Sequence, residues 1–149
     1  VLGGDIFIFY IVNVKTKTVS SLKRKLDKLF SIWVRQQGMT WKEENKCFTC
    51  GKRDHWKRLQ CGHFVSRADN NLRYDEQNCH PQCVSCNVFK SGNMVVYAIE
   101  MRKKYGKNII EKLYKRSQRP KNWTVKELEK LIVKYGTIKA FNRVVKNTI

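Results

Sequence analysis

The sequence predicts an α+β fold in which a small, cysteine-stapled core is flanked by basic helices. Two cysteine pairs, Cys47-x-x-Cys50 and Cys83-x-x-Cys86, can place four thiolates around one Zn²⁺. Apolar residues recur at helical spacing before and after these pairs. The 149 residues carry 31 Lys and Arg against 12 Asp and Glu, a formal net charge of +19. We therefore divide the chain into an N-terminal part, a zinc-stapled core and a basic helical part that packs on the core: residues 1–40, 41–95 and 96–149.

The N-terminal part begins with an apolar run, residues 6–12, that we expect to form a buried strand. This run is too short to span a bilayer, which takes about 20 residues, and it lacks the basic residues that precede a secretory signal. The missing initiator Met leads us to expect a processed or partial chain. Ser20 or Ser21 is predicted to cap a helix running to about Gln37, with Gly38 as its stop. One face of this helix is apolar: Leu22, Leu26, Leu29, Phe30, Trp33 and Val34.

The core contains short predicted strands and loops, and residues 59–65 are expected to form one strand. Because periodic apolar positions are few here, metal ligation must supply part of the stability. Helical periodicity returns in two later segments, residues 94–101 and 109–114. Thr124-x-x-Glu127 is typical of a capping box and predicts a last helix through Tyr135.

Zinc is the favoured occupant of the four-cysteine clamp. The six cysteines of the chain could form disulfides in a secreted protein, but tight pairs in a Lys-rich chain favour zinc in a reducing cytosol. A thiol redox role is a poorer interpretation, since a clamp of four cysteines is expected to be locked by its metal. Cys61 and Cys79 lack partners at ligand spacing, so we expect them to be buried or incidental thiols.

The clamp encloses residue types that suit phosphodiester hydrolysis. His63 lies between the two pairs, Asn78 precedes the second pair and Asn87 follows it directly. A histidine can deprotonate water near neutral pH because its unperturbed pKa is about 6.5. An amide oxygen suits a hard cation such as Mg²⁺ or Mn²⁺, which stabilises charge on the phosphate and on the leaving oxygen.

This arrangement resembles the zinc-stapled HNH endonucleases, also called ββα-metal or His-Me finger nucleases. The resemblance implies a ββα-metal core in which His63 is the general base. It also implies that Asn78 orients His63 or its loop. Asn87 would bind the catalytic Mg²⁺ or Mn²⁺, with His63 as a further ligand.

The chain departs from the HNH pattern at Gly62, where the family usually carries an acidic metal ligand directly before the base. Another carboxylate must then complete the cation site. Glu76 is our preferred substitute, ahead of Asp75 and Asp69.

A closer resemblance covers about residues 40–135. Its motifs follow one another in the order Cys47-x-x-Cys50-Gly51, Gly62-His63-Phe64, Leu72-Arg73-Tyr74, Asn78-x-His80-x-Gln82-Cys83-x-x-Cys86-Asn87, Lys90-Ser91-Gly92-Asn93 and Trp123-Thr124. This string is similar to the NinG/Rap recombination proteins of lambdoid phages. It implies a structure-specific endonuclease of the host cytoplasm that acts on Holliday junctions and D-loops. His80 fits the motif as a second cation ligand or phosphate contact, and paired cuts would suit a homodimer.

The alternative function is a non-catalytic zinc-finger DNA-binding module in which His63 and Asn87 are structural. Both functions agree with the charge surplus, which points to nucleic acid; an anionic membrane is the rival partner, but no long apolar helix supports it. Trp41 and Trp56 could stack on unpaired bases, while Trp33 and Trp123 are better assigned to the core. The residues predicted to contact backbone phosphates are Arg73, Lys90, Arg102, Lys103, Lys104, Lys115, Arg116, Arg119 and Lys121.

Overall fold

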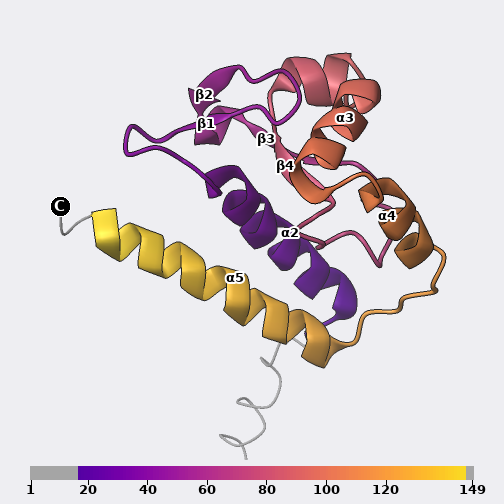
Figure 1. The fold of residues 1–149 in the computed structure, drawn as a ribbon. Helices are drawn as coiled ribbons and strands as arrows, with labels where there is room; N and C mark the ends of the chain where they lie inside the picture. Colours follow the sequence, from indigo (N-terminus) through magenta and orange to yellow (C-terminus); the bar gives the residue numbers. More distant parts are fainter. Residues whose placement is uncertain (1–16, 147–149) are drawn as a thin grey trace, which may run out of the picture.

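The computed structural model describes residues 17–146, and their side chains as far as residue 137. The strand expected at residues 6–12 lies outside the described residues. The predicted α+β class is confirmed (Figure 1). In chain order the elements are α2 (Val19–Gln36), β1 (Glu44–Lys46), β2 (Arg53–His55), η1 (Trp56–Arg58), β3 (Gln60–His63), β4 (Cys79–Gln82), η2 (Ser85–Phe89), α3 (Met94–Tyr105), α4 (Ile109–Ser117) and α5 (Val125–Lys146). Six short elements, four strands and two short helical segments, lie between α2 and α3 in the chain. Within residues 17–146, no helix is both long and apolar enough to cross a membrane.

Helix α2 begins with a capping box at Thr18, two or three residues before the predicted cap at Ser20 or Ser21. The cap is Thr18, whose Oγ1 accepts from the Ser21 N–H at 3.1 Å, while the Ser21 hydroxyl accepts from the Thr18 N–H at 3.1 Å. Thr is also a favoured N-cap residue, and Ser21 serves as its partner at the third helical position and not as the cap itself. The helix ends at Gln36, and Gly38 takes the left-handed conformation (φ +74°) that permits the chain to turn away.

Helices α2 and α5 lie side by side and form the first hydrophobic core (Figure 1). Phe30 is the centre of an aromatic cluster, with its ring centroid 5.0 Å from that of Tyr135 and 5.7 Å from that of Tyr74. The apolar faces of the first and last helices therefore pack on each other rather than offering a surface to a second copy. This core joins residues from all three predicted segments, since buried Cys79 belongs to it as well.

Strands β3 and β4 form an antiparallel pair that separates the first core from a second one. Its register places Gly62 opposite His80 and His63 opposite Cys79, so alternate residues point to opposite sides. One side carries His63 and Cys79 and faces α2, whereas the other faces α3 and α4. The second core on that side is built from Leu72, Tyr97, Met101, Ile109 and Leu113.

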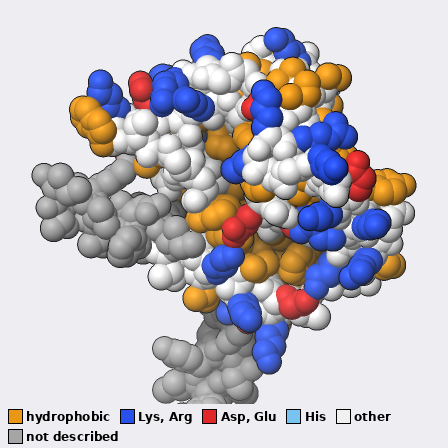
Figure 2. Space-filling model, in the orientation of Figure 1, with side chains coloured by type: hydrophobic (Ala, Val, Ile, Leu, Met, Phe, Trp, Pro, Cys, Tyr) orange, Lys and Arg blue, Asp and Glu red, His pale blue; other side chains and the backbone are white. Residues whose placement is uncertain are grey.

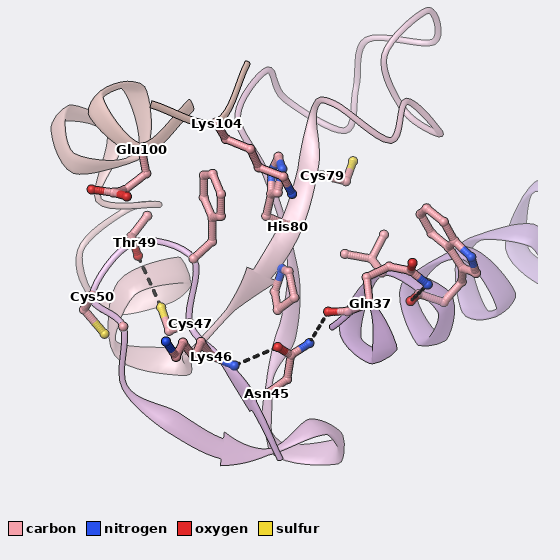
Figure 3. Close-up of a pocket in the computed structure, with 15 residues that line it drawn as sticks. Gln37, Asn45, Lys46, Cys47, Thr49, Cys50, Cys79, His80, Glu100 and Lys104 are labelled. Atoms are coloured by element: carbon pink, nitrogen blue, oxygen red, sulfur yellow. Dashed lines mark hydrogen bonds between the residues drawn. The ribbon is translucent and has the colours of Figure 1, made fainter. Parts of the chain in front are cut away.

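The β1–β2 hairpin is attached to the end of α2 by a buried amide. Asn45 donates through Nδ2 to the Arg35 carbonyl at 2.9 Å and to the Gln37 carbonyl at 2.7 Å (Figure 3). These carbonyls have no partner within the helix because they belong to its last turn. The hairpin that carries the first cysteine pair is thereby fixed to the N-terminal helix.

Candidate functional site

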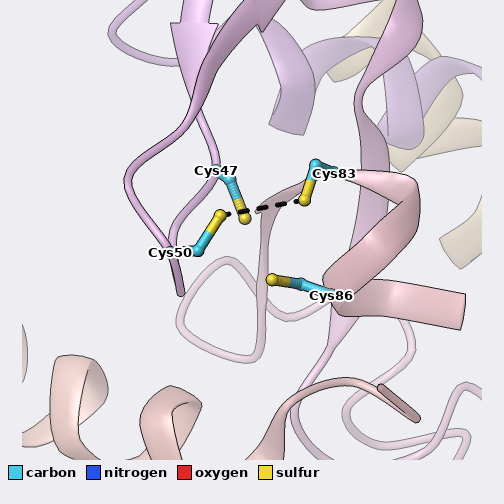
Figure 4. Close-up of side chains that lie close together, drawn as sticks. All are labelled: Cys47, Cys50, Cys83 and Cys86. Carbon is cyan, nitrogen blue, oxygen red and sulfur yellow. Dashed lines mark hydrogen bonds between the residues drawn. The ribbon is translucent and has the colours of Figure 1, made fainter. Parts of the chain in front are cut away.

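The four cysteines of the two pairs converge on one point (Figure 4). Their sulfur atoms all lie within 4.8 Å of one another, and Cys50 Sγ is 3.8 Å from Cys83 Sγ. The first pair occupies the tip of the β1–β2 hairpin, where Gly51 supplies the left-handed turn residue (φ +74°). The second pair lies where β4 runs into η2. Four sulfurs from two such turns fit the tetrahedral shell of a structural zinc ion.

The surroundings of Cys47 favour the thiolate form that a metal needs. Burial alone would raise its pKa, but the backbone of Cys50, Cys83 and Thr49 and the Thr49 hydroxyl hydrogen-bond to it and lower the pKa to about 6. Burial and the neighbouring sulfurs raise the pKa of Cys50 to about 12. Several thiolates this close repel one another, and a divalent cation relieves that repulsion.

A basic hollow of about 640 Å³ lies between α2, β3 and the loop that follows β3. His63 and Asn87 both line it, so the structure brings together two of the residues predicted to be catalytic. Five basic side chains surround them: Arg35, Lys57, Arg58, Arg67 and Arg73. Asp27 is the one acidic side chain in this lining among the described residues.

The His63 ring is hydrogen-bonded to the backbone, and its lowered pKa favours the neutral imidazole. Its Nε2 lies 3.1 Å from the Arg73 carbonyl oxygen, and because a carbonyl can only accept, Nε2 must carry the proton. The lone pair then resides on Nδ1. Burial lowers the His63 pKa from 6.5, outweighing the opposing hydrogen bonds to the backbone of Arg73 and Cys61. A neutral, oriented histidine is the form in which the residue can accept a proton.

Asn78 determines the shape of the loop that holds His63. Its side chain is fully buried, accepts from the Val65 N–H at 2.7 Å, and donates to the carbonyls of Val65 at 2.9 Å and Leu72 at 3.0 Å. One amide therefore joins the beginning and the end of the loop. Arg73, the next residue after Leu72, presents its carbonyl to His63 as a result.

Asp27 is a site residue that the sequence analysis missed. Its carboxylate accepts from Arg73 Nε at 2.9 Å and Nη2 at 2.7 Å, and from the Tyr74 hydroxyl at 3.0 Å. These hydrogen bonds attach the loop to helix α2 at Arg73, the residue whose carbonyl contacts His63. The available signal was that Asp27 is the lone acidic residue in the helix sequence of α2.

Asp27→Asn is expected to lower the free energy of unfolding by about 1.5–3 kcal/mol at neutral pH, the range for hydrogen bonds to a charged group. Burial raises the Asp27 pKa, but the hydrogen bonds and charge of Arg73 prevail and lower it below 3.8. A depressed folded-state pKa means that the contribution is fully present above about pH 5 and is lost as pH falls through the folded pKa. Urea unfolding of both proteins at pH 7 and pH 3 checks this; an equal difference at both pH values would contradict it.

Asn87 does not cap the long helix that follows it. It lies inside η2, and its Nδ2 donates to Gln60 Oε1 at 2.7 Å, while Asn93 stands at the N-cap position of α3. Gln60, the first residue of β3, also lines the hollow. Each amide carries an oxygen of the kind that binds a hard cation.

Gly62 is required by the buried side chain of Gln82. A Cβ added at Gly62 would lie 2.0 Å from Gln82 Oε1 and 2.9 Å from its Cγ. Gln82 cannot move freely, because it is fully buried and its Nε2 donates to the Gly92 carbonyl at 2.8 Å. The acidic ligand that HNH enzymes usually carry before the base therefore has no room in this chain.

Gly62→Ala is expected to destabilise the fold by about 1–3 kcal/mol, the usual cost of forcing an atom into a packed interior. Gln82→Ala removes the obstructing atoms, so the double variant should lose less than the sum of the two single losses. Thermal or urea unfolding of the four proteins gives the coupling. Additive losses would show that the two side chains do not compete for this space.

The carboxylates proposed to replace that ligand all have other partners. Glu76, the preferred one, accepts from Lys134 Nζ at 2.7 Å and the Tyr135 hydroxyl at 3.0 Å, on the α5 side of the molecule. Asp75 pairs with Arg116 at 2.6 Å, and Asp69 accepts from backbone N–H groups in its own turn. The assignment of Glu76 to the cation site is corrected accordingly.

His80 is also separated from the hollow. It occupies the opposite side of the β3–β4 pair, where its ring nitrogens lie 3.0 Å from the Tyr97 hydroxyl and 2.8 Å from the Tyr105 hydroxyl. Its ring stacks on Phe48 at 3.9 Å, and burial, followed by the charge of Lys104, lowers its pKa to about 3. Both nitrogens are engaged, so His80 is a core residue and not a cation ligand or phosphate contact.

A second hollow, of about 540 Å³, lies between the first cysteine pair, β4 and α3 (Figure 3). Lys104 and Glu100 stand at its edge, and His80 and Cys79 form part of its wall. Neither His63 nor Asn87 lines it. The residues that suit phosphodiester chemistry therefore belong to the basic hollow alone, within the described part of the chain.

The predicted phosphate contacts fall into two groups. Arg73, Arg116 and Lys121 are ion-paired within the fold, with Asp27, Asp75 and Glu127 respectively, so their charges are already compensated. The other six are exposed: Lys90, Arg102, Lys103, Lys104, Lys115 and Arg119. Of these, Lys103 forms an ion pair with Glu100 at the surface. Figure 2 shows Lys and Arg side chains spread over α3 and α4 with few acidic side chains among them. Lys57 and Arg67 beside His63 were not predicted, and they have no ion-pair partner among the described side chains.

Comparison with known proteins agrees with the resemblance noted from the motifs. Residues 11–144 match the family model described as bacteriophage lambda NinG protein. Over 90 residues, or 60% of this chain, the sequence is 36% identical to protein ninG of Escherichia phage 933W, and 32% identical to protein ninG of Escherichia phage lambda and of Salmonella phage P22. These matches span 43–44% of the relatives' own length. No solved structure matches the chain.

Proposed function

This chain belongs to the NinG family of phage proteins, and on that premise we propose that it is a metal-dependent, structure-specific DNA endonuclease. It cleaves branched recombination intermediates, namely Holliday junctions and D-loops, by hydrolysing a phosphodiester bond in the cytoplasm of the host. The observation that carries the proposal is the state of His63, which is neutral, oriented by a carbonyl through Nε2, and set in a basic hollow beside Asn87.

In this mechanism His63 acts as the general base. Its Nδ1 accepts a proton from a water molecule, and the resulting hydroxide attacks the phosphorus of the scissile phosphate. The Arg73 carbonyl keeps the ring in the required tautomer, and Asp27 and Asn78 hold that carbonyl in place. Arg67 and Lys57 attract the phosphates of the substrate into the hollow.

Two metals complete the proposal. The four-cysteine clamp fits Zn²⁺ as a structural ion, because its donors are all sulfur and no fifth donor is needed. Asn87 and Gln60 are the residues that would hold Mg²⁺ or Mn²⁺ through amide oxygens, with the substrate phosphate as the remaining anionic donor. That cation would stabilise charge on the phosphate and on the leaving oxygen.

The test is cleavage of synthetic four-way junctions, D-loops and linear duplexes by one zinc-loaded preparation. With Mg²⁺ or Mn²⁺ we expect the branched substrates to be cut in preference to the linear duplex, and no cutting when both cations are withheld. Paired cuts on a junction would favour a homodimer, and sedimentation of the complex measures its stoichiometry. Binding without cleavage of any substrate would favour the non-catalytic zinc-finger module instead.

DNA binding should depend steeply on salt if the hollow holds phosphates. Arg67→Ala and Lys57→Ala are each expected to reduce the slope of log K against log salt by about 1, since each removes one phosphate contact. Lys130→Ala, at an exposed position of α5 outside the hollow, serves as the matched control. Titration of a labelled junction at several salt concentrations measures the slopes. Equal slopes for all four proteins would place the DNA elsewhere.

A further inference from the structure

Cys61 and Cys79, which the sequence left without partners, meet at His63. Their two sulfur atoms and a ring nitrogen of His63 lie within 4.8 Å of one another. None of these three residues belongs to the four-cysteine clamp. Two sulfurs and one imidazole are a donor set that selects a thiophilic divalent ion such as Zn²⁺.

The antiparallel register explains why these three side chains converge. Cys61 and His63 are two residues apart on β3, so they project from the same side of the strand. Cys79 stands directly opposite His63 on β4 and projects from that side too. The side in question faces α2 and the basic hollow, which both Cys61 and His63 line.

The position of the group differs from that of a buried thiol pair. Cys79 is 3% exposed and lies in the core under α2, whereas Cys61 and His63 reach the hollow. Arg35 lies close enough to Cys61 for the two groups to interact electrostatically. Three inner donors with one side open to the hollow leave a fourth position for water, as in three-ligand zinc sites.

A disulfide is a poorer explanation of the same pair. Cys61 stands opposite Pro81, not Cys79, so the two cysteines are diagonal neighbours across the strands. Diagonal residues have Cα atoms about 7–8 Å apart, beyond the range of about 4.4–6.8 Å in which a disulfide closes. A metal ion bridges two sulfurs without requiring them to bond.

We propose that Cys61, His63 and Cys79 form a second site for a thiophilic divalent ion, which silences the nuclease when it binds. Binding replaces the two thiol protons and takes the one nitrogen lone pair of the neutral His63 imidazole, so no nitrogen is left to accept a proton from water. The silencing rests on the proposed function of His63 as general base. The existence of the site does not.

The first measurement is metal content, which needs no cleavage. Protein exchanged against buffered free Zn²⁺ under reducing conditions is expected to hold two equivalents per chain. Cys61→Ala, which leaves buried Cys79 untouched, and Cys79→Ala should each hold one. One equivalent in the parent, or two in both variants, would overturn the site, even if the protein proves to be no nuclease.

The second measurement is the Mg²⁺-dependent cleavage rate at rising free Zn²⁺, each protein being compared with its own rate without added Zn²⁺. The parent should lose cleavage as the second equivalent binds. In Cys61→Ala the half-inhibiting Zn²⁺ concentration should rise about tenfold or more, since even outer contacts of a metal site contribute that much to affinity. Equal inhibition of both proteins, or faster cleavage with Zn²⁺, would contradict the silencing.

Discussion

His63→Ala is expected to lower the cleavage rate by about 10²–10⁴-fold, the usual contribution of a positioned general base. DNA binding and the zinc content of the four-cysteine clamp should stay unchanged, because His63 contributes to neither. Single-turnover cleavage of a four-way junction at saturating protein separates the chemical step from binding. The loss should therefore appear in the rate and not in the affinity.

The matched control is His55→Ala, a histidine on the β1–β2 hairpin that pairs with Glu43 at 3.2 Å. It lines neither hollow, and we expect its cleavage rate to equal that of the parent. Retention of parental cleavage by His63→Ala would end the assignment of the base. Loss of binding together with cleavage would instead indicate a structural role for His63.

Removal of zinc from the four-cysteine clamp should have the largest effect on stability. In zinc-finger peptides the metal contributes about 10–16 kcal/mol of folding free energy. Among the described side chains, the apolar cluster around the clamp adds only Leu59 to Cys47, Cys83 and Cys86, so little apolar packing replaces the ion. A strong chelator, or Cys83→Ser, is expected to lower Tm by about 10 °C or more.

Cys61→Ser provides the control for thiol loss, since Cys61 lies outside the clamp. Its Tm should fall by far less than that of Cys83→Ser when both are measured by circular dichroism with one zinc equivalent present. An unchanged Tm in excess chelator would show that the clamp holds no stabilising metal.

The helices were predicted well because their signals are local. Apolar spacing alone identified the buried face of α2, and Gly106 ends α3 with φ +92° as expected of a left-handed stop. Local rules also have local ambiguities, which is why the cap was placed at Ser20 or Ser21 rather than Thr18. The last helix was predicted to end at Tyr135 but continues to Lys146; Gly136 lies inside the helix without ending it, and no Pro follows.

The site was predictable only where its residues are close in sequence. The spacing of the cysteine pairs and of Asn87 predicts metal ligands from the sequence alone. Asp27 reaches the hollow through the packing of α2, which sequence spacing does not reveal. Glu76 failed for the same reason, since its partners Lys134 and Tyr135 lie 58 and 59 residues away along the chain. Cys61 and Cys79 looked incidental until the strand register brought both to His63.

The packing of α2 against α5 determines whether the basic hollow can form in a shorter fragment of the chain. Residues 51–82, between the cysteine pairs, contain His63, but one wall of the basic hollow belongs to α2, and α2 packs against α5. Excising residues 41–95, or grafting them into another protein, would transfer the four-cysteine clamp without the hydrogen bonds between Asp27 and Arg73. The smallest fragment expected to keep the hollow intact therefore extends from Thr18 to beyond Tyr135 and includes residues 51–82.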